Sequence, residues 1–92
     1  MRRPGGRLLQ RLLSSLLALV VLTAMGGAQL EAGKWEAAAR SLERAVALDP
    51  SAWTVRLLLG RAYQQLGRLD EAERELTLAR KGWANQGSVT VR

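Results

Sequence analysis

The sequence predicts an all-α fold in which short helical hairpins follow a long hydrophobic helix. Leu and Ala dominate the composition, Phe is absent and proline occurs only twice, so helix is the favoured local conformation along nearly the whole chain. An uncharged stretch near the N-terminus is followed by segments in which apolar residues recur every three to four positions. With 92 residues, the chain has room for one small domain with a thin core.

The uncharged stretch, residues 12–30, predicts the hydrophobic helix. It contains 19 consecutive residues without a charge, and four arginines precede it with no acid among them. This length is close to the ~20 residues that a helix needs to cross a bilayer, and exceeds the roughly 7–15 residues of a signal-peptide core. We therefore predict that residues 1–30 are a basic N-terminus and single-pass membrane anchor. Because positive residues stay in the cytoplasm, the N-terminus is expected there and the rest of the chain on the extracytoplasmic side.

Two other interpretations of this segment remain open. Small residues at Gly26 and Ala28 suit a signal-peptidase site, and cleavage there would leave a periplasmic or secreted protein. Residues 7–17 alternate leucines with Arg, Gln and Ser as an amphipathic helix does, which suits a soluble adaptor whose first helix packs within a larger complex.

Three further amphipathic helices are predicted at about residues 36–48, 52–66 and 69–83. The first stops before Pro50, and the second stops before Gly67, where a left-handed terminating residue is favoured. In the third, acidic residues come first and basic residues last, which matches the helix dipole. The connections are short, so neighbouring helices are expected to run antiparallel. Residues 87–92 are expected to form a frayed tail, or alternatively a strand added to a partner's sheet.

The composition argues against an enzyme and against nucleic-acid binding. The chain has no Cys and no His, which removes disulfides, thiolate nucleophiles, Cys/His zinc sites and the imidazole base. Residues 31–92 carry ten basic and eight acidic side chains at helical spacings, typical of solvated helix faces rather than of a basic stripe. We predict no catalytic residue, no cofactor, no metal and no nucleic-acid partner.

The sequence also repeats itself with a period of 34 residues. The matches fall mostly on small residues, which allow two helix backbones to approach closely. We expect Gly60 and Ala72 to face each other across such a crossing. The identical pairs are Val21/Val55, Gly26/Gly60, Ala28/Ala62, Gly33/Gly67, Ala38/Ala72, Arg40/Arg74, Leu42/Leu76 and Ala45/Ala79.

These residues resemble the tetratricopeptide repeat family, whose 34-residue pattern is W-x2-L-G-x2-Y, then A-x3-F, then P. The second repeat, residues 53–86, supplies Leu59-Gly60-x2-Tyr63 and then Ala72-x3-Leu76. The first repeat, residues 19–52, supplies Ala38-x3-Leu42 and Pro50, so its first helix overlaps the hydrophobic segment. The family's residues at the helix-pair seams correspond here to the expected core positions Trp35, Leu59, Tyr63 and Leu69.

The resemblance implies a protein-interaction scaffold or assembly subunit. Such repeats stack into a solenoid whose concave face holds a peptide or a partner helix. Leu57 and Arg61 stand where members that clamp a C-terminal carboxylate carry Lys and Asn, so the resemblance does not extend to that ligand. Two tryptophans at helix ends are added as candidates because Trp is enriched in interface centres. The candidate partner-binding residues are Thr54, Leu57, Arg61, Gln64, Gln65, Trp53 and Trp83.

Overall fold

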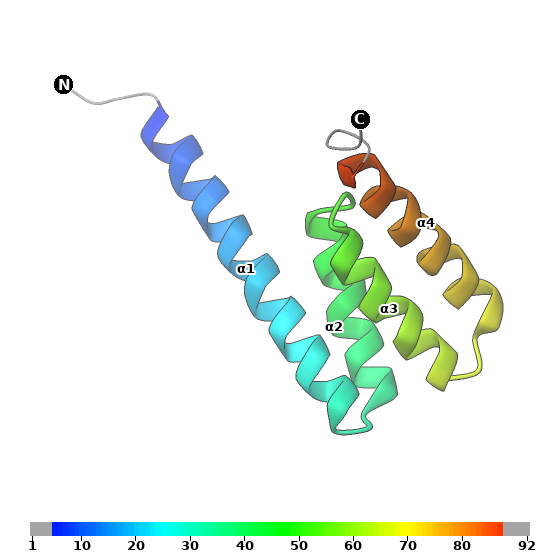
Figure 1. Ribbon diagram of the computed structural model, residues 1–92. Helices are drawn as coiled ribbons and strands as arrows, with labels where there is room; N and C mark the ends of the chain where they lie inside the picture. The colour runs from blue at the N-terminus through cyan, green and yellow to red at the C-terminus, as the bar shows by residue number, and fades with distance from the viewer. Residues whose placement is uncertain (1–4, 88–92) are drawn as a thin grey trace.

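The computed structural model describes residues 5–87 and arranges them in helices joined by short turns (Figure 1). The four helices in that range are α1 (Gly5–Glu31), α2 (Trp35–Leu48), α3 (Trp53–Gln65) and α4 (Leu69–Gly87). The predicted all-α fold, with a long apolar helix followed by helical hairpins, is therefore confirmed. The ribbon shows α1 leading into α2 and α3 leading into α4 as antiparallel pairs.

The predicted ends of the three amphipathic helices are nearly correct, except at the C-terminus, and α1 begins earlier than the uncharged stretch that predicts it. Helix α4 continues to Gly87, past the predicted end near residue 83, because no proline interrupts residues 84–87. Gly87, the first residue of the predicted tail, is accordingly part of the helix. The strand alternative for the tail concerns residues 88–92, which lie outside the described residues.

Both hairpins use the same turn, 34 residues apart. Gly33 and Gly67 have φ angles of 78° and 79°, in the left-handed region that favours glycine. The backbone N–H that follows each glycine donates a hydrogen bond to the carbonyl five residues before it. Lys34 N–H donates to the Gln29 carbonyl at 2.8 Å, and Arg68 N–H donates to the Tyr63 carbonyl at 2.9 Å. These bonds close a Schellman motif, which satisfies carbonyls that the helix end would leave unpaired.

The helix crossings repeat in the same way. A Cβ built on Gly26 would come within 2.5 Å of Leu42 Cδ2, and a Cβ on Gly60 would come within 2.7 Å of Leu76 Cδ2. Only glycine therefore allows each pair of helices to approach as closely as it does. The Ala72 carbonyl oxygen also lies 3.4 Å from the same built atom on Gly60, so the expected facing of Gly60 and Ala72 is confirmed.

The core lies along the seams between the helices. It combines small residues with a few large ones, as expected for a chain of this size. Leu59 and Tyr63 are buried as predicted, and Trp35 is half-buried. The prediction for Leu69 is wrong: 64% of it is exposed, because it begins α4 and precedes the turns that pack on α3. The buried hydrophobic residues are Ala38, Ala39, Leu42, Ala45, Val55, Leu59, Ala62, Tyr63, Ala72 and Ala79.

Helix α1 has two halves with different surroundings. In its second half, Leu19, Leu22 and Leu30 pack against the core, and Ser41 Oγ of α2 is hydrogen-bonded to the Gln29 side-chain amide at 2.9 Å. In its first half, every described side chain up to Leu17 is exposed. Figure 1 shows this half diverging from the other helices.

Candidate functional site

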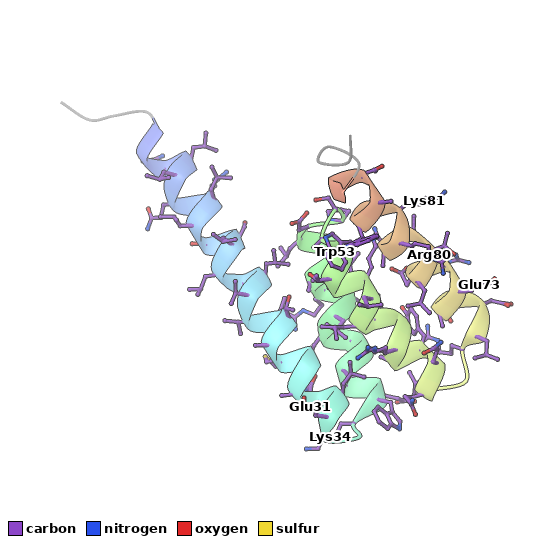
Figure 2. The ribbon with its side chains drawn as sticks, in the orientation of Figure 1. Glu31, Lys34, Trp53, Glu73, Arg80 and Lys81 are labelled. Atoms are coloured by element: carbon purple, nitrogen blue, oxygen red, sulfur yellow. The ribbon has the colours of Figure 1, made fainter. Side chains whose placement is uncertain are left out.

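A hollow of about 380 Å³ lies between α3 and α4, the two helices of the second hairpin. Two residues of α3 and four residues of α4 form its walls, and all but one of them are apolar or aromatic. Figure 2 places Trp53 between α3 and α4, with Arg80 and Lys81 on α4 nearby. The lining residues are Trp53, Leu57, Leu76, Ala79, Arg80 and Trp83.

A glycine in α4 brings Trp53 into this position. A Cβ on Gly82 would come within 2.8 Å of the Trp53 Cβ, so a larger residue would push the start of α3 away from α4. Leu57 lies one turn after Trp53 on the same side of α3. Trp83 follows Gly82 directly and is 58% exposed at the rim of the hollow. Sequence reasoning missed Gly82, although an isolated glycine inside a helical pattern is a signal for close packing.

The structure gathers three of the predicted partner-binding residues and leaves the other four outside the hollow. Trp53, Leu57 and Trp83 line it together. The remaining four are exposed on α3. One precedes Leu57 by three residues, one follows it by four, and the last two follow that one by three and four, so they form one polar strip along this helix. These four residues are Thr54, Arg61, Gln64 and Gln65.

The charge in the hollow is positive. Arg80 is the charged residue among the six that line it, and no acid belongs to that set. The nearby Arg56 is engaged elsewhere, since its guanidinium donates to Glu75 Oε1 at 2.7 Å and to the Pro50 carbonyl at 2.9 Å. This half-buried ion pair fixes α3 against α4 beside the site. Arg80 therefore suits an incoming carboxylate.

Comparison of the two repeats shows which kind of element would cover the hollow. On α2, Glu43 faces α3, because Tyr63 Oη donates to its Oε2 atom at 2.5 Å. Ala39 and Val46 lie four residues before and three after Glu43, so they share that side of α2. Ala39 is buried and Val46 is packed against the core. This side of α2 is thus the surface that α3 covers.

The corresponding side of α4 carries charges instead. Thirty-four residues later, Glu73 stands in place of Ala39 and Arg80 in place of Val46, and both are exposed. Between them, Leu76 and Ala79 correspond to Leu42 and Ala45, which are 0% exposed in the first repeat. The hollow therefore occupies the position at which the next helix would pack, on a face that carries one charge of each sign. We name Glu73, Leu76, Arg80 and Trp83 the α4 face.

Around Tyr63 the polar contacts are structural. Burial, followed by the hydrogen bond to Glu43, raises the pKa of the Tyr63 phenol above its ordinary value. The Arg68 guanidinium lies 4.5 Å from the centre of the Tyr63 ring and is bonded to Glu71 at 2.6 Å, which lowers the Glu71 pKa. Among residues 5–87, no three metal-ligating side chains come together.

One comparison with known proteins, that with family models, agrees with this geometry. A family model described as tetratricopeptide repeat matches residues 29–82, which include α2, α3 and most of α4. Neither the comparison with curated proteins nor the comparison with solved structures gives a match. The matched residues are more than half of the 92-residue chain and contain both glycine turns. The chain therefore belongs to the tetratricopeptide repeat family.

Proposed function

We propose that this protein is a protein-interaction scaffold, held at a membrane through α1, that binds a helix of a partner protein on the α4 face. The observation that carries the proposal is the hollow between Trp53, Leu57 and Trp83, which lies where a further helix would pack on α4. The family generally binds proteins or peptides through such helical surfaces. A non-enzymatic role follows from the same membership.

The α4 face suggests the chemistry of the partner helix. An apolar side chain would fill the hollow beside Leu57 and Trp83, as hydrophobic grooves accept the apolar face of amphipathic helices. A carboxylate would lie opposite Arg80 and a basic side chain opposite Glu73. These two α4 residues are seven positions apart, about 10 Å along the helix. The partner helix should thus carry opposite charges about two turns apart, with an apolar residue between them.

The membrane part of the proposal rests on α1. Residues 6–31 form a helix that is long and apolar enough to cross a membrane, with a mean hydropathy of 1.9 over its most apolar 18 residues. A signal sequence near the N-terminus has the same properties, so the secreted form and the soluble adaptor are the competing outcomes. The sequence predicts a single-pass orientation, with a cytoplasmic N-terminus and extracytoplasmic repeats; attachment to one face of the membrane is the competing way in which α1 can hold the chain there.

Site-specific photocrosslinking tests the binding site. A benzophenone side chain at Leu57 should crosslink the partner, whereas the same group at Arg44, exposed on α2, should not. Mass spectrometry of the crosslinked peptide should identify an amphipathic helix with an acid near the crosslink, and Arg80→Glu should abolish the product by charge repulsion. A crosslink that is equally strong at Arg44, or that is insensitive to Arg80→Glu, would contradict the proposed site.

A further inference from the structure

The first half of α1 is amphipathic, in contrast to the uncharged second half. At 3.6 residues per turn, its leucines occupy about half of the helix circumference and its polar residues occupy the other half. The polar residues Arg7, Gln10, Arg11, Ser14 and Ser15 line one shallow surface recess, so they lie together on one side. The leucines, all exposed, are Leu8, Leu9, Leu12, Leu13, Leu16 and Leu17.

The second half of α1 is already engaged with protein. Gly26 lies against Leu42, Gln29 is bonded to Ser41, and Leu22 packs on the core. If α1 crossed a bilayer, the uncharged residues 12–30, close to the ~20 that a helix needs, would have to lie in hydrocarbon. Helix α2, which is packed beside residues 19–30, would enter the membrane with them, together with its exposed charges Arg40 and Arg44. Crossing is therefore incompatible with an intact first hairpin.

The part of α1 that is free of protein contacts is too short to cross. Residues 6–18 span ~20 Å at 1.5 Å per residue, against a hydrocarbon thickness of ~30 Å. If this part entered end-on, Arg7 and Arg11 at its tip would lie in the hydrocarbon, where charged residues are strongly disfavoured. If it lies flat, the leucines enter the membrane and both arginines stay at the headgroups. A flat orientation therefore satisfies every side chain of this segment.

We propose that residues 6–18 form an in-plane anchor, which lies at the lipid–water boundary of an anionic membrane and keeps the N-terminus on the same side as the repeats. This inference rests on the membrane part of the proposed function, and it specifies how α1 uses the lipid. The leucine face supplies the buried apolar area, and the arginines supply attraction to anionic headgroups. The first hairpin stays folded, because its α1 contacts are left in place.

Cysteine labelling tests on which side of the membrane each end of α1 lies. Only an introduced cysteine would be labelled, since the chain contains none of its own. Gly6→Cys reports the N-terminal end, where an added Cβ meets nothing within 4 Å, and Arg40→Cys reports the repeat side. In sealed membrane vesicles, a membrane-impermeant maleimide should label both positions from the same side. Labelling of the two positions from opposite sides would overturn the in-plane anchor and leave a membrane-held scaffold. Recovery of the chain in the soluble fraction, or loss of the Gly6→Cys reporter by cleavage, would overturn the membrane part of the proposed function as well.

Binding of the purified full chain to protein-free lipid vesicles tests whether residues 6–18 bind lipid itself or a protein within the membrane. Cosedimentation should be stronger with phosphatidylcholine vesicles that contain phosphatidylglycerol than with phosphatidylcholine alone. Replacing Arg7 and Arg11 by Gln should weaken binding to the anionic vesicles roughly 10- to 30-fold. The matched control, Arg40→Gln with Arg44→Gln, removes the same charge from α2 and should change binding little. Absence of binding to both vesicle types, or equal loss in both double variants, would overturn the proposal.

Discussion

Gly60 of α3 lies directly against Leu76 of α4, since a Cβ at position 60 would come within 2.7 Å of the leucine Cδ2 atom. Thirty-four residues earlier, Gly26 and Leu42 make the same contact between α1 and α2. The two hairpins are thus held by one kind of crossing, in which a glycine accepts a leucine side chain.

Replacing Gly60 should destabilise the second hairpin. We expect Gly60→Ala to lower the free energy of unfolding by ~1–3 kcal/mol, because the new methyl group must displace Leu76, and Gly60→Leu to cost more. The measurement is thermal or denaturant unfolding of the full chain followed by circular dichroism.

Gly27→Ala is the matched control for that substitution. This glycine is also helical, but a Cβ there meets nothing within 4 Å, so alanine should be neutral or stabilising by up to ~1 kcal/mol. Combining Gly60→Ala with Leu76→Ala should show non-additive losses, because the smaller side chain makes room for the methyl group. Equal unfolding midpoints for Gly60→Ala and Gly27→Ala would contradict the tight crossing.

Trp83→Ala should weaken partner binding by about 30-fold or more, as a tryptophan at the centre of an interface commonly does. Leu69→Ala is the control, because Leu69 is another exposed large apolar residue of α4 at the opposite end of the helix. Neither substitution should change the unfolding midpoint by much. Titration of the crosslinked partner's helix as a peptide measures the effect, and similar affinities for the two variants would exclude the hollow as the binding site.

Tyr63 predicts a loss of stability at alkaline pH. Burial and the hydrogen bond to Glu43 raise the pKa of its phenol in the folded chain above the ordinary value of about 10. The folded chain therefore holds this proton more tightly than the unfolded chain. The resulting stability is fully present below about pH 10 and decreases as the pH rises above that value. Tyr63→Phe removes the titrating group, so its unfolding midpoint should fall less steeply than that of the wild type between about pH 10 and 11.5. Parallel pH profiles for the two proteins would refute this assignment.

Glu73 and Arg80 should keep the chain from stacking on itself. The double variant Glu73→Ala, Arg80→Val gives α4 the residues that α2 carries at the same positions. A second copy could then pack α1 there, since its exposed Val21 and Met25 correspond to the buried Val55 and Leu59. We expect a concentration-dependent rise in mass, measured by analytical ultracentrifugation.

Asp70→Ala with Arg74→Val is the control for self-association. It makes the same change in charge at exposed α4 positions beside the α4 face, and should leave the mass unchanged. If the Glu73/Arg80 variant also keeps the wild-type mass, the two charges do not control stacking.

Several elements of the fold could be predicted because they depend on local chemistry. Pro50, the glycines at the turns and the 3.6-residue periodicity define the helices, and the 34-residue period predicts the crossing at Gly60. Leu69 shows the limit of this reasoning: its position in the repeat pattern suggests burial, whereas its exposure depends on where α4 meets α3.

The site was only partly predictable for a related reason. Trp53 and Trp83 could be chosen by residue type, but their meeting with Leu57 depends on the close approach at Gly82, which periodicity does not reveal. The role proposed for Arg80 likewise depends on a comparison of its position with that of Val46 in three dimensions. Arg80 is exposed, as a charge on a solvated face would be, but it also lines an apolar hollow.

The placement of the tryptophans gives the protein a built-in optical reporter. Two of its three tryptophans line the hollow, and α1 contains none. Trp35, the third, begins α2 beside the Gly33 turn, so its emission can be removed by Trp35→Phe without altering the hollow. Fluorescence from the remaining indoles would then respond to a ligand on the α4 face but not directly to lipid around residues 6–18. Occupation of the two surfaces could therefore be followed separately, in one unlabelled molecule.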